Sequence, residues 1–179
     1  MTMTPPLRKF VLAVHLTSSV GWIGAVVAYL ALAVATRTSQ DAQMVRAAFL
    51  ALELITRFVL VPLALASLLT GIVQSLGTPW GLFRHYWVLI SLLLTIIATL
   101  VLLTRLEPIS FLAGIAAEAD SADLLALEAD LLHPVGGLLV LLVIQVLNVY
   151  KPRGLTPYGW RKQQEERRKP HEQRTVLQP

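Results

Sequence analysis

The stretch VHLTSSVGWIGAVVAYL, residues 14–30, lies inside an apolar run that extends from Phe10 to Ala35. About 20 consecutive apolar residues suffice for a helix to cross the ~30 Å hydrocarbon core of a bilayer. Arg8 and Lys9 precede the run, as basic residues precede a secretory signal, but the run is too long for the apolar part of a signal peptide. We therefore expect a retained membrane-spanning helix, and one that carries a histidine, two serines and a tryptophan.

The composition extends this expectation to most of the chain. Of the 179 residues, 55% are hydrophobic and only 15% are charged, whereas about a quarter of the residues in soluble domains are charged. The absence of cysteine excludes disulfides, thiolate metal sites and cysteine nucleophiles. Four apolar blocks are long enough to span a membrane: 10–35, 54–76, 86–105 and 133–150.

Backbone polar groups in lipid must be satisfied within the chain, so these blocks are expected to be helices. The sequence predicts an all-α fold, a polytopic membrane four-helix bundle formed by residues 1–150. The last helix could begin as early as Ser121, with Pro134 as a kink rather than a start.

Charge predicts the orientation of this bundle. Eight of the fifteen Lys and Arg residues follow Tyr150, whereas the segment from Glu107 to Asp130 contains six acids and no Lys or Arg. By the positive-inside rule, we expect both termini in the cytoplasm of a bacterium and the chain in its cytoplasmic (inner) membrane. Residues 151–179 form a basic tail, expected to be partly disordered or a short surface helix and to contact membrane lipids rather than nucleic acid.

Winding the first span at 100° per residue separates two faces. The aliphatic face is expected to contact lipid: Leu16, Val20, Ile23, Val27 and Leu30. The opposite face is expected to point into the bundle: His15, Ser18, Ser19, Trp22, Val26 and Tyr29. Small residues between the two faces would let a neighbouring helix, or a second copy or a membrane partner, approach closely.

Histidines suggest two kinds of site. His15 and His85 fall at the cytoplasmic end and are candidate ligands of a b-type haem, with Trp22 and Ser19 beside them. A structural hydrogen bond, or a proton or metal role for His15, is the alternative. At the other end, His133 and Glu53 are candidates for a proton or metal site. The alternative for Glu53 is an ion pair with Arg57, which stands four residues later.

Three segments resemble known membrane families. The motif HLTSSVGWIGA (15–25) resembles the first helix of copper-resistance protein D and HemJ-type membrane proteins. The segments SLLTGIVQSLGTPWGLFRHYWVLISLLLT (67–95) and NVYKPRGLTPYGWRKQ (148–163) are similar to an uncharacterised, actinobacterial-type family of four-helix integral membrane proteins. The HemJ-type resemblance implies haem binding at His15. The HemJ-type family also relies on a lysine in a later helix. This sequence has no Lys between Lys9 and Lys151, which counts against the protoporphyrinogen oxidation that this resemblance would otherwise imply.

No P-loop, HExxH, haem-attachment CxxCH or nucleophile elbow is present, so the sequence favours a non-enzymatic protein over an enzyme. Three functions stay open: a haem protein for electron transfer or haem handling, a membrane interaction module, and a small proton or metal transporter subunit.

Overall fold

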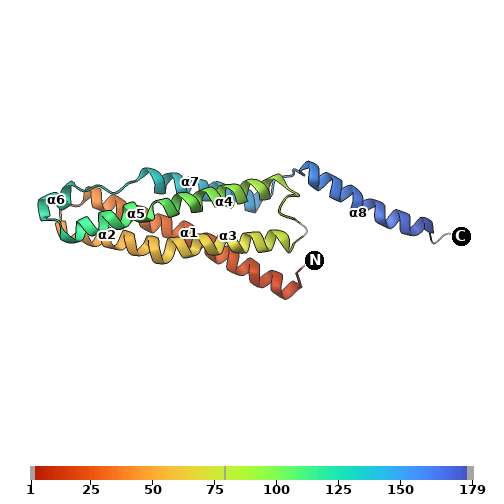
Figure 1. The fold of residues 1–179 in the computed structure, drawn as a ribbon, viewed down its shortest axis with the longest axis horizontal. Helices are drawn as coiled ribbons and strands as arrows, with labels where there is room; N and C mark the ends of the chain where they lie inside the picture. The colour runs from red at the N-terminus through yellow and green to blue at the C-terminus, as the bar shows by residue number, and fades with distance from the viewer. Residues whose placement is uncertain (1–2, 79, 177–179) are drawn as a thin grey trace.

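Helices make up the chain in the computed structural model, which describes residues 3–78 and 80–176 (Figure 1). In chain order they are α1 (Pro5–Thr38), α2 (Ala42–Ile55), the π-helical turn η1 (Thr56–Leu60), α3 (Val61–Leu76), α4 (Tyr86–Thr104), α5 (Leu106–Glu118), α6 (Ser121–Ala126), α7 (Leu132–Tyr150) and α8 (Pro157–Val176). Between His85 and Leu155 lies an isolated β-bridge. The predicted all-α fold is confirmed.

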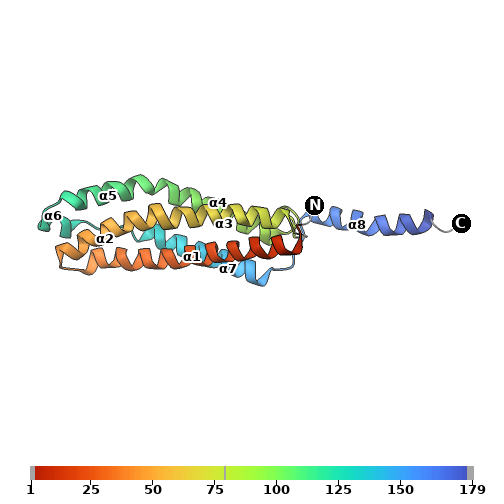
Figure 2. The same cartoon turned by 90° about the horizontal axis from the view of Figure 1, so that it is seen from below.

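Four helical segments are long and apolar enough to cross a membrane, as an integral membrane protein requires: Pro5–Thr38, Ala42–Leu76, Tyr86–Glu118 and Leu132–Tyr150. They run side by side along one axis (Figures 1 and 2). The first three contain 34, 35 and 33 residues, which at 1.5 Å per residue is about 50 Å. They are longer than the sequence suggested and exceed the ~30 Å hydrocarbon core, so part of each extends into the interface or beyond it.

The second segment contains a π-helical turn, η1, directly before Pro62. Proline has no N–H to donate, and its ring crowds the carbonyl four residues earlier, here that of Phe58. Phe58 lies inside η1, where the backbone N–H of Val61 bonds the carbonyl of Thr56 instead. The expected distortion at Pro62 is therefore absorbed by a π turn, and the helix continues.

The possible early start of the last helix at Ser121 is wrong. The segment Ser121–Ala126 forms the separate helix α6, and α7 begins at Leu132. Pro134 lies in the first turn of α7, where a missing N–H leaves no intrahelical bond unmade, so it does not kink the helix. The carboxylate of Asp130 accepts the backbone N–H of Leu132 at 2.9 Å and so supports this start.

The basic tail forms α8, which continues beyond the bundle along its long axis (Figure 2). Its start is attached to the α3–α4 loop: the backbone N–H of Thr156 donates to the carbonyl of Arg84 at 3.0 Å. The guanidinium of Arg84 also bonds both carboxylate oxygens of Glu166, at 3.2 and 2.9 Å. The described part of the tail is thus helical, but it projects along the axis of the bundle, so the expected helix on the membrane surface stays a prediction; residues 177–179 lie outside the described part.

The two predicted faces of the first span are found in α1. Ser18, Trp22, Val26 and Tyr29 are buried in the bundle. On the aliphatic face, Leu16, Val20 and Val27 are exposed, whereas Ile23 and Leu30 are half-buried against the core. The helix therefore presents polar and aromatic side chains to its neighbours and aliphatic ones to the surroundings.

Candidate functional site

Two cavities in the described part of the bundle are candidate sites, and they share no lining residue. The first, the His15 cavity, has a volume of about 330 Å³ and is lined by α1, α3, α4 and α7 in the half near the termini. The second, the Arg105 cavity, has a volume of about 420 Å³ and lies in the half near α6. Both volumes fall in the range of sites that bind small molecules.

His15 is held in one orientation by α3. Its Nδ1 lies 3.2 Å from the carbonyl oxygen of Ser67 and 3.1 Å from the hydroxyl of Thr70. The Thr70 hydroxyl donates its own hydrogen to the carbonyl of Ala66 at 2.5 Å, so toward His15 it acts as an acceptor. Since both neighbours accept, we assign the proton to Nδ1, which leaves Nε2 with a free lone pair.

The surroundings of the ring fit this assignment. Within the described part of the chain, Nε2 of His15 makes no hydrogen bond. The ring packs against Gly71, where an added Cβ would lie only 3.1 Å from Cε1 of His15. Ser19, one turn further along α1, bonds the hydroxyl of Ser67 at 2.8 Å and also lines the cavity.

Buried polar atoms without partners surround the His15 cavity. The side-chain oxygens of Gln74, Thr78 and Ser91 have no hydrogen-bond partner in the described residues, and all three side chains line the cavity. Ser91 is only 6% exposed. Buried polar atoms in native proteins nearly always find a partner, in protein, water or ligand. The cavity wall therefore offers hydrogen bonds to a molecule inside.

His85, the second predicted haem ligand, is not in this cavity. It precedes the first residue of α4, and its Nδ1 lies 2.7 Å from the carbonyl oxygen of Trp80. Its ring packs edge-on against the Trp80 indole, 5.3 Å between centroids. Trp80 and Trp87 line the cavity, whereas His85 does not. The structure thus brings His15 and Ser19 together and leaves His85 apart.

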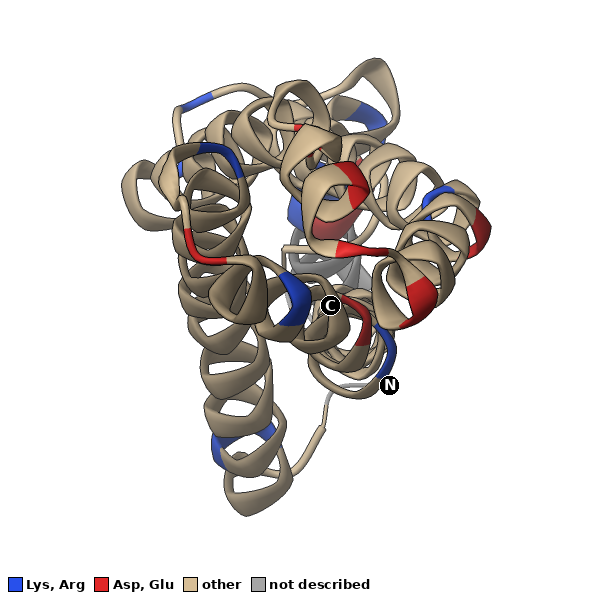
Figure 3. Ribbon diagram, turned by 90° about the vertical axis from the view of Figure 1, so that its left-hand side faces the viewer, with Lys and Arg blue, Asp and Glu red and all other residues tan. Residues whose placement is uncertain are grey.

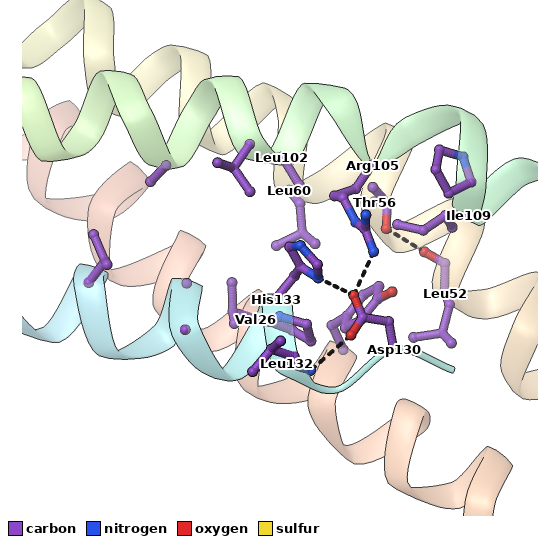
Figure 4. Close-up of a pocket in the computed structure, with 18 of the residues that line it drawn as sticks. Val26, Leu52, Thr56, Leu60, Leu102, Arg105, Ile109, Asp130, Leu132 and His133 are labelled. Atoms are coloured by element: carbon purple, nitrogen blue, oxygen red, sulfur yellow. Dashed lines mark hydrogen bonds and ion pairs between the residues drawn. The ribbon is translucent and has the colours of Figure 1, made fainter. Parts of the chain in front are cut away.

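Trp22, predicted to lie beside His15, lines the Arg105 cavity instead. This cavity is almost entirely apolar except where Arg105, Asp130 and His133 meet, and the apolar side chains of Ile109 and Leu52 lie beyond them (Figure 4). One carboxylate oxygen of Asp130 accepts from Arg105 at 2.6 Å and from Nδ1 of His133. The other accepts from the backbone N–H of Leu132.

Two opposing effects act on the pKa of Asp130. Burial raises the pKa, but the hydrogen bonds from His133, from the backbone of Leu132 and from Arg105 outweigh burial and hold it below its ordinary value. Asp130 is therefore ionised at neutral pH and binds Arg105 as a carboxylate.

The predicted metal pair is not assembled. Glu53 bonds Arg57 at 3.4 Å, the arrangement expected from their spacing, and Arg57 also donates to Ser110 at 2.9 Å. His133 bonds Asp130 instead of Glu53. Residues 3–78 and 80–176 contain no group of three or more His, Cys, Asp or Glu side chains placed to hold a metal ion.

Sequence reasoning did not identify Asp130 and Arg105 as site residues. Asp130 stands three residues before His133, a spacing that is compatible with the pair, but five other acids in the same segment give Asp130 no distinction in the sequence. Its pairing with Arg105 joins the end of α4 to the start of α7, and helix adjacency is not visible in a sequence.

No family model, curated protein or solved structure matches this chain. A functional proposal must therefore come from the chemistry of the two cavities.

Proposed function

We propose that this is a multi-pass protein of the bacterial cytoplasmic membrane that binds a b-type haem in the His15 cavity, for electron transfer or haem handling. The observation that carries the proposal is the fixed His15 ring, whose Nδ1 is bonded while Nε2 makes no hydrogen bond within the described residues. The unpartnered side chains around the same cavity support it.

The imidazole environment of His15 suits an iron ligand. Metal-binding histidines almost always donate their other ring N–H to a carbonyl or carboxylate, which fixes the tautomer and raises the basicity of the ligating nitrogen. The Ser67 carbonyl occupies this role for His15. When bound, haem would supply one-electron redox chemistry tuned by its axial ligand and by the polarity around it.

Lys151 is suited to an auxiliary role. It lines the same cavity and lies where α7 ends, with Nζ 5.2 Å from the centroid of the Trp80 ring. An ammonium group at this end of the cavity would pair with a haem carboxylate. His15 and Lys151 together then provide a ligand for the iron and a charge partner for the edge of the macrocycle.

The proposal changes the predicted ligand set. His85 is held by Trp80 and by its backbone bridge to Leu155, outside the cavity. We therefore propose His15 as the single histidine ligand, in place of the His15–His85 pair that the sequence suggested.

The distribution of basic residues supports cytoplasmic termini. Arg37, Arg46, Arg57 and Arg105 belong to the half of the bundle near α6, and the other eleven of the fifteen Lys and Arg belong to the terminal end and the tail. Figure 3 views the molecule from the α6 end, where acidic residues lie on the nearest elements. The positive-inside rule then assigns the α6 end to the outside.

The test is the visible absorption spectrum of the protein purified in detergent, as isolated and after stepwise addition of haemin. We expect a Soret band that saturates at one haem per chain. A protein that shows no Soret shift at any haemin concentration, while circular dichroism confirms its helices, would overturn the proposal. The alternative function is then that of a membrane interaction module, whose activity should be lost when the tail after Tyr150 is removed and kept when His15 is replaced.

A further inference from the structure

The Arg105 cavity is apolar along most of its length, and its charged side chains lie nearer one end. Its lining extends along α4 and α5 from Leu94 to Leu112, and Arg105 lies eleven residues, about 16 Å at 1.5 Å per residue, from Leu94. The buried side chains of Trp22, Phe49 and Leu60 form part of its wall. The apolar stretch from Arg105 toward Leu94 is longer than the one toward Leu112, so the cavity matches a molecule with a long apolar body and a polar group toward its other end.

The cavity reaches the surface of the bundle between α4 and α7. Six residues of its lining are exposed: Ile97, Val101, Pro108, Leu132, His133 and Gly136. A Cβ added at Gly136 or Gly137 would meet nothing within 4 Å, so these glycines leave open space in the wall. Apart from His133, the exposed rim is apolar, so we expect the opening to face acyl chains rather than water.

A hydrocarbon core that begins at Tyr86 would place the charged groups at the level of the lipid headgroups. Arg105 is nineteen residues beyond Tyr86, the first residue of α4, which is about 29 Å at 1.5 Å per residue. This length equals the thickness of the hydrocarbon core. A molecule entering from the membrane would therefore keep its tail at acyl-chain depth and place its polar end beside Arg105.

The electrostatics favour an uncharged polar end. The positive charge of Arg105 is already matched by the carboxylate of Asp130. Segments 37–57 and 105–130, which form this end, carry four Arg and eight Asp or Glu residues. An anionic head would meet no excess of positive charge here. A neutral acceptor can be bound, since a guanidinium has five N–H donors and that of Arg105 bonds only Asp130 within the described part of the chain.

We propose that the Arg105 cavity binds an uncharged, membrane-dissolved amphiphile whose polar end bears carbonyl oxygens, with Arg105 as hydrogen-bond donor and the tail between α4 and α7. Two membrane sources share this chemistry, an isoprenoid quinone and a glyceride. This site is separate from the His15 cavity, and its occupancy does not depend on haem.

Trp22 provides a reporter inside the cavity, because it lines the wall and is only 3% exposed. The chain has four tryptophans, so replacing Trp80, Trp87 and Trp160 by Phe leaves Trp22 as the single emitter. This variant in detergent is titrated with three quenchers: a quinone with a decyl chain, a monoglyceride with a brominated acyl chain, and the matching brominated fatty acid. The last two differ in the charge of the polar end.

We expect saturable quenching of Trp22 by the quinone, the monoglyceride or both. The fatty acid anion should bind at least tenfold more weakly. The neutral probe that binds more tightly identifies whether the natural ligand is an isoprenoid quinone or a glyceride. Gly137→Leu fills the open space and should weaken binding at least tenfold. Gly24→Leu is the matched control, because a Cβ at Gly24 also meets nothing within 4 Å but lies outside the cavity. It should bind as the parent does.

Equal quenching in Gly137→Leu and Gly24→Leu would mean that the probes only dissolve in the micelle, and would overturn the proposal. Binding of the fatty acid anion as tight as that of the monoglyceride would overturn the assignment of an uncharged head. If the tryptophan replacements prevent folding, the test is repeated by calorimetry, in which the same probes are titrated into the protein that keeps its four tryptophans.

Discussion

Replacing Asp130 by alanine removes the group that joins α4 to α7. The carboxylate accepts one hydrogen bond from Arg105 at 2.6 Å, one from His133 and one from the backbone N–H of Leu132. The Arg105 and Asp130 side chains are about one-third exposed, 32% and 35%, so their ion pair contributes only about 0.5–1 kcal/mol. The bond to the first N–H of α7 contributes about 1 kcal/mol, as helix-capping bonds do.

Together these contributions give a loss of about 2 kcal/mol for Asp130→Ala. In a chain of this size that corresponds to a fall in Tm of about 4–8 °C. Asp130→Asn keeps an acceptor for the Leu132 N–H and removes the charge, so its loss should be about half as large. Thermal unfolding in detergent, followed by circular dichroism, measures both variants, with Asp123→Ala as the control at an exposed acid.

The pH dependence tests the electrostatic part separately. The folded-state pKa of Asp130 lies below its ordinary value, so its charge stabilises the fold above the unfolded-state pKa of about 3.9. The stabilisation is lost as the pH falls through the folded-state pKa. The difference in Tm between the parent and Asp130→Asn should have its largest value at pH 7 and should decrease below about pH 4. A Tm unchanged by Asp130→Ala at pH 7, or a loss as large for Asn as for Ala, would refute the reasoning.

Three further variants test other parts of the structure. Gly71→Val places methyl groups against the His15 ring and should lower stability by about 1–3 kcal/mol, whereas Gly24→Val, which meets open space, should unfold at the parent Tm. Ser91→Ala removes an unpartnered buried hydroxyl, so the Tm of the haem-free protein should stay equal or rise; a clear fall would show that the hydroxyl has a partner. Arg84→Gln removes the pairing with α8; stability should change by less than about 1 kcal/mol, but limited proteolysis should cut α8 from the bundle faster, and an unchanged rate would count against this attachment.

The faces of the first span could be predicted because helix geometry is local. A residue's angular position follows from its number alone, and four of the residues predicted to point into the bundle, Ser18, Trp22, Val26 and Tyr29, are buried. Hydropathy also gave the number of spans, since each contains an uninterrupted apolar block. It did not give the full helix lengths, because charged residues such as Glu53 and Arg105 interrupt the apolar pattern while the helical segment continues past them.

The grouping of histidines could not be predicted in the same way. His15 and His85 both lie toward the terminal end, but His85 is fixed by the loop before α4 through Trp80. Loop conformation depends on tertiary contacts, here including the bridge to Leu155, seventy residues away. Arg105 and Asp130 are likewise paired by the packing of α4 against α7, which no periodicity encodes.

The most direct test of the central claim compares haem affinity in two matched variants, His15→Ala and His85→Ala. Haemin is titrated into each detergent-purified protein and the Soret band gives the dissociation constant. We predict that His85→Ala binds haem within about threefold of the parent, whereas His15→Ala weakens binding by at least about a hundredfold, or roughly 2.7 kcal/mol. Equal losses in the two variants would restore the paired ligation suggested by the sequence, and full binding by His15→Ala would contradict the account.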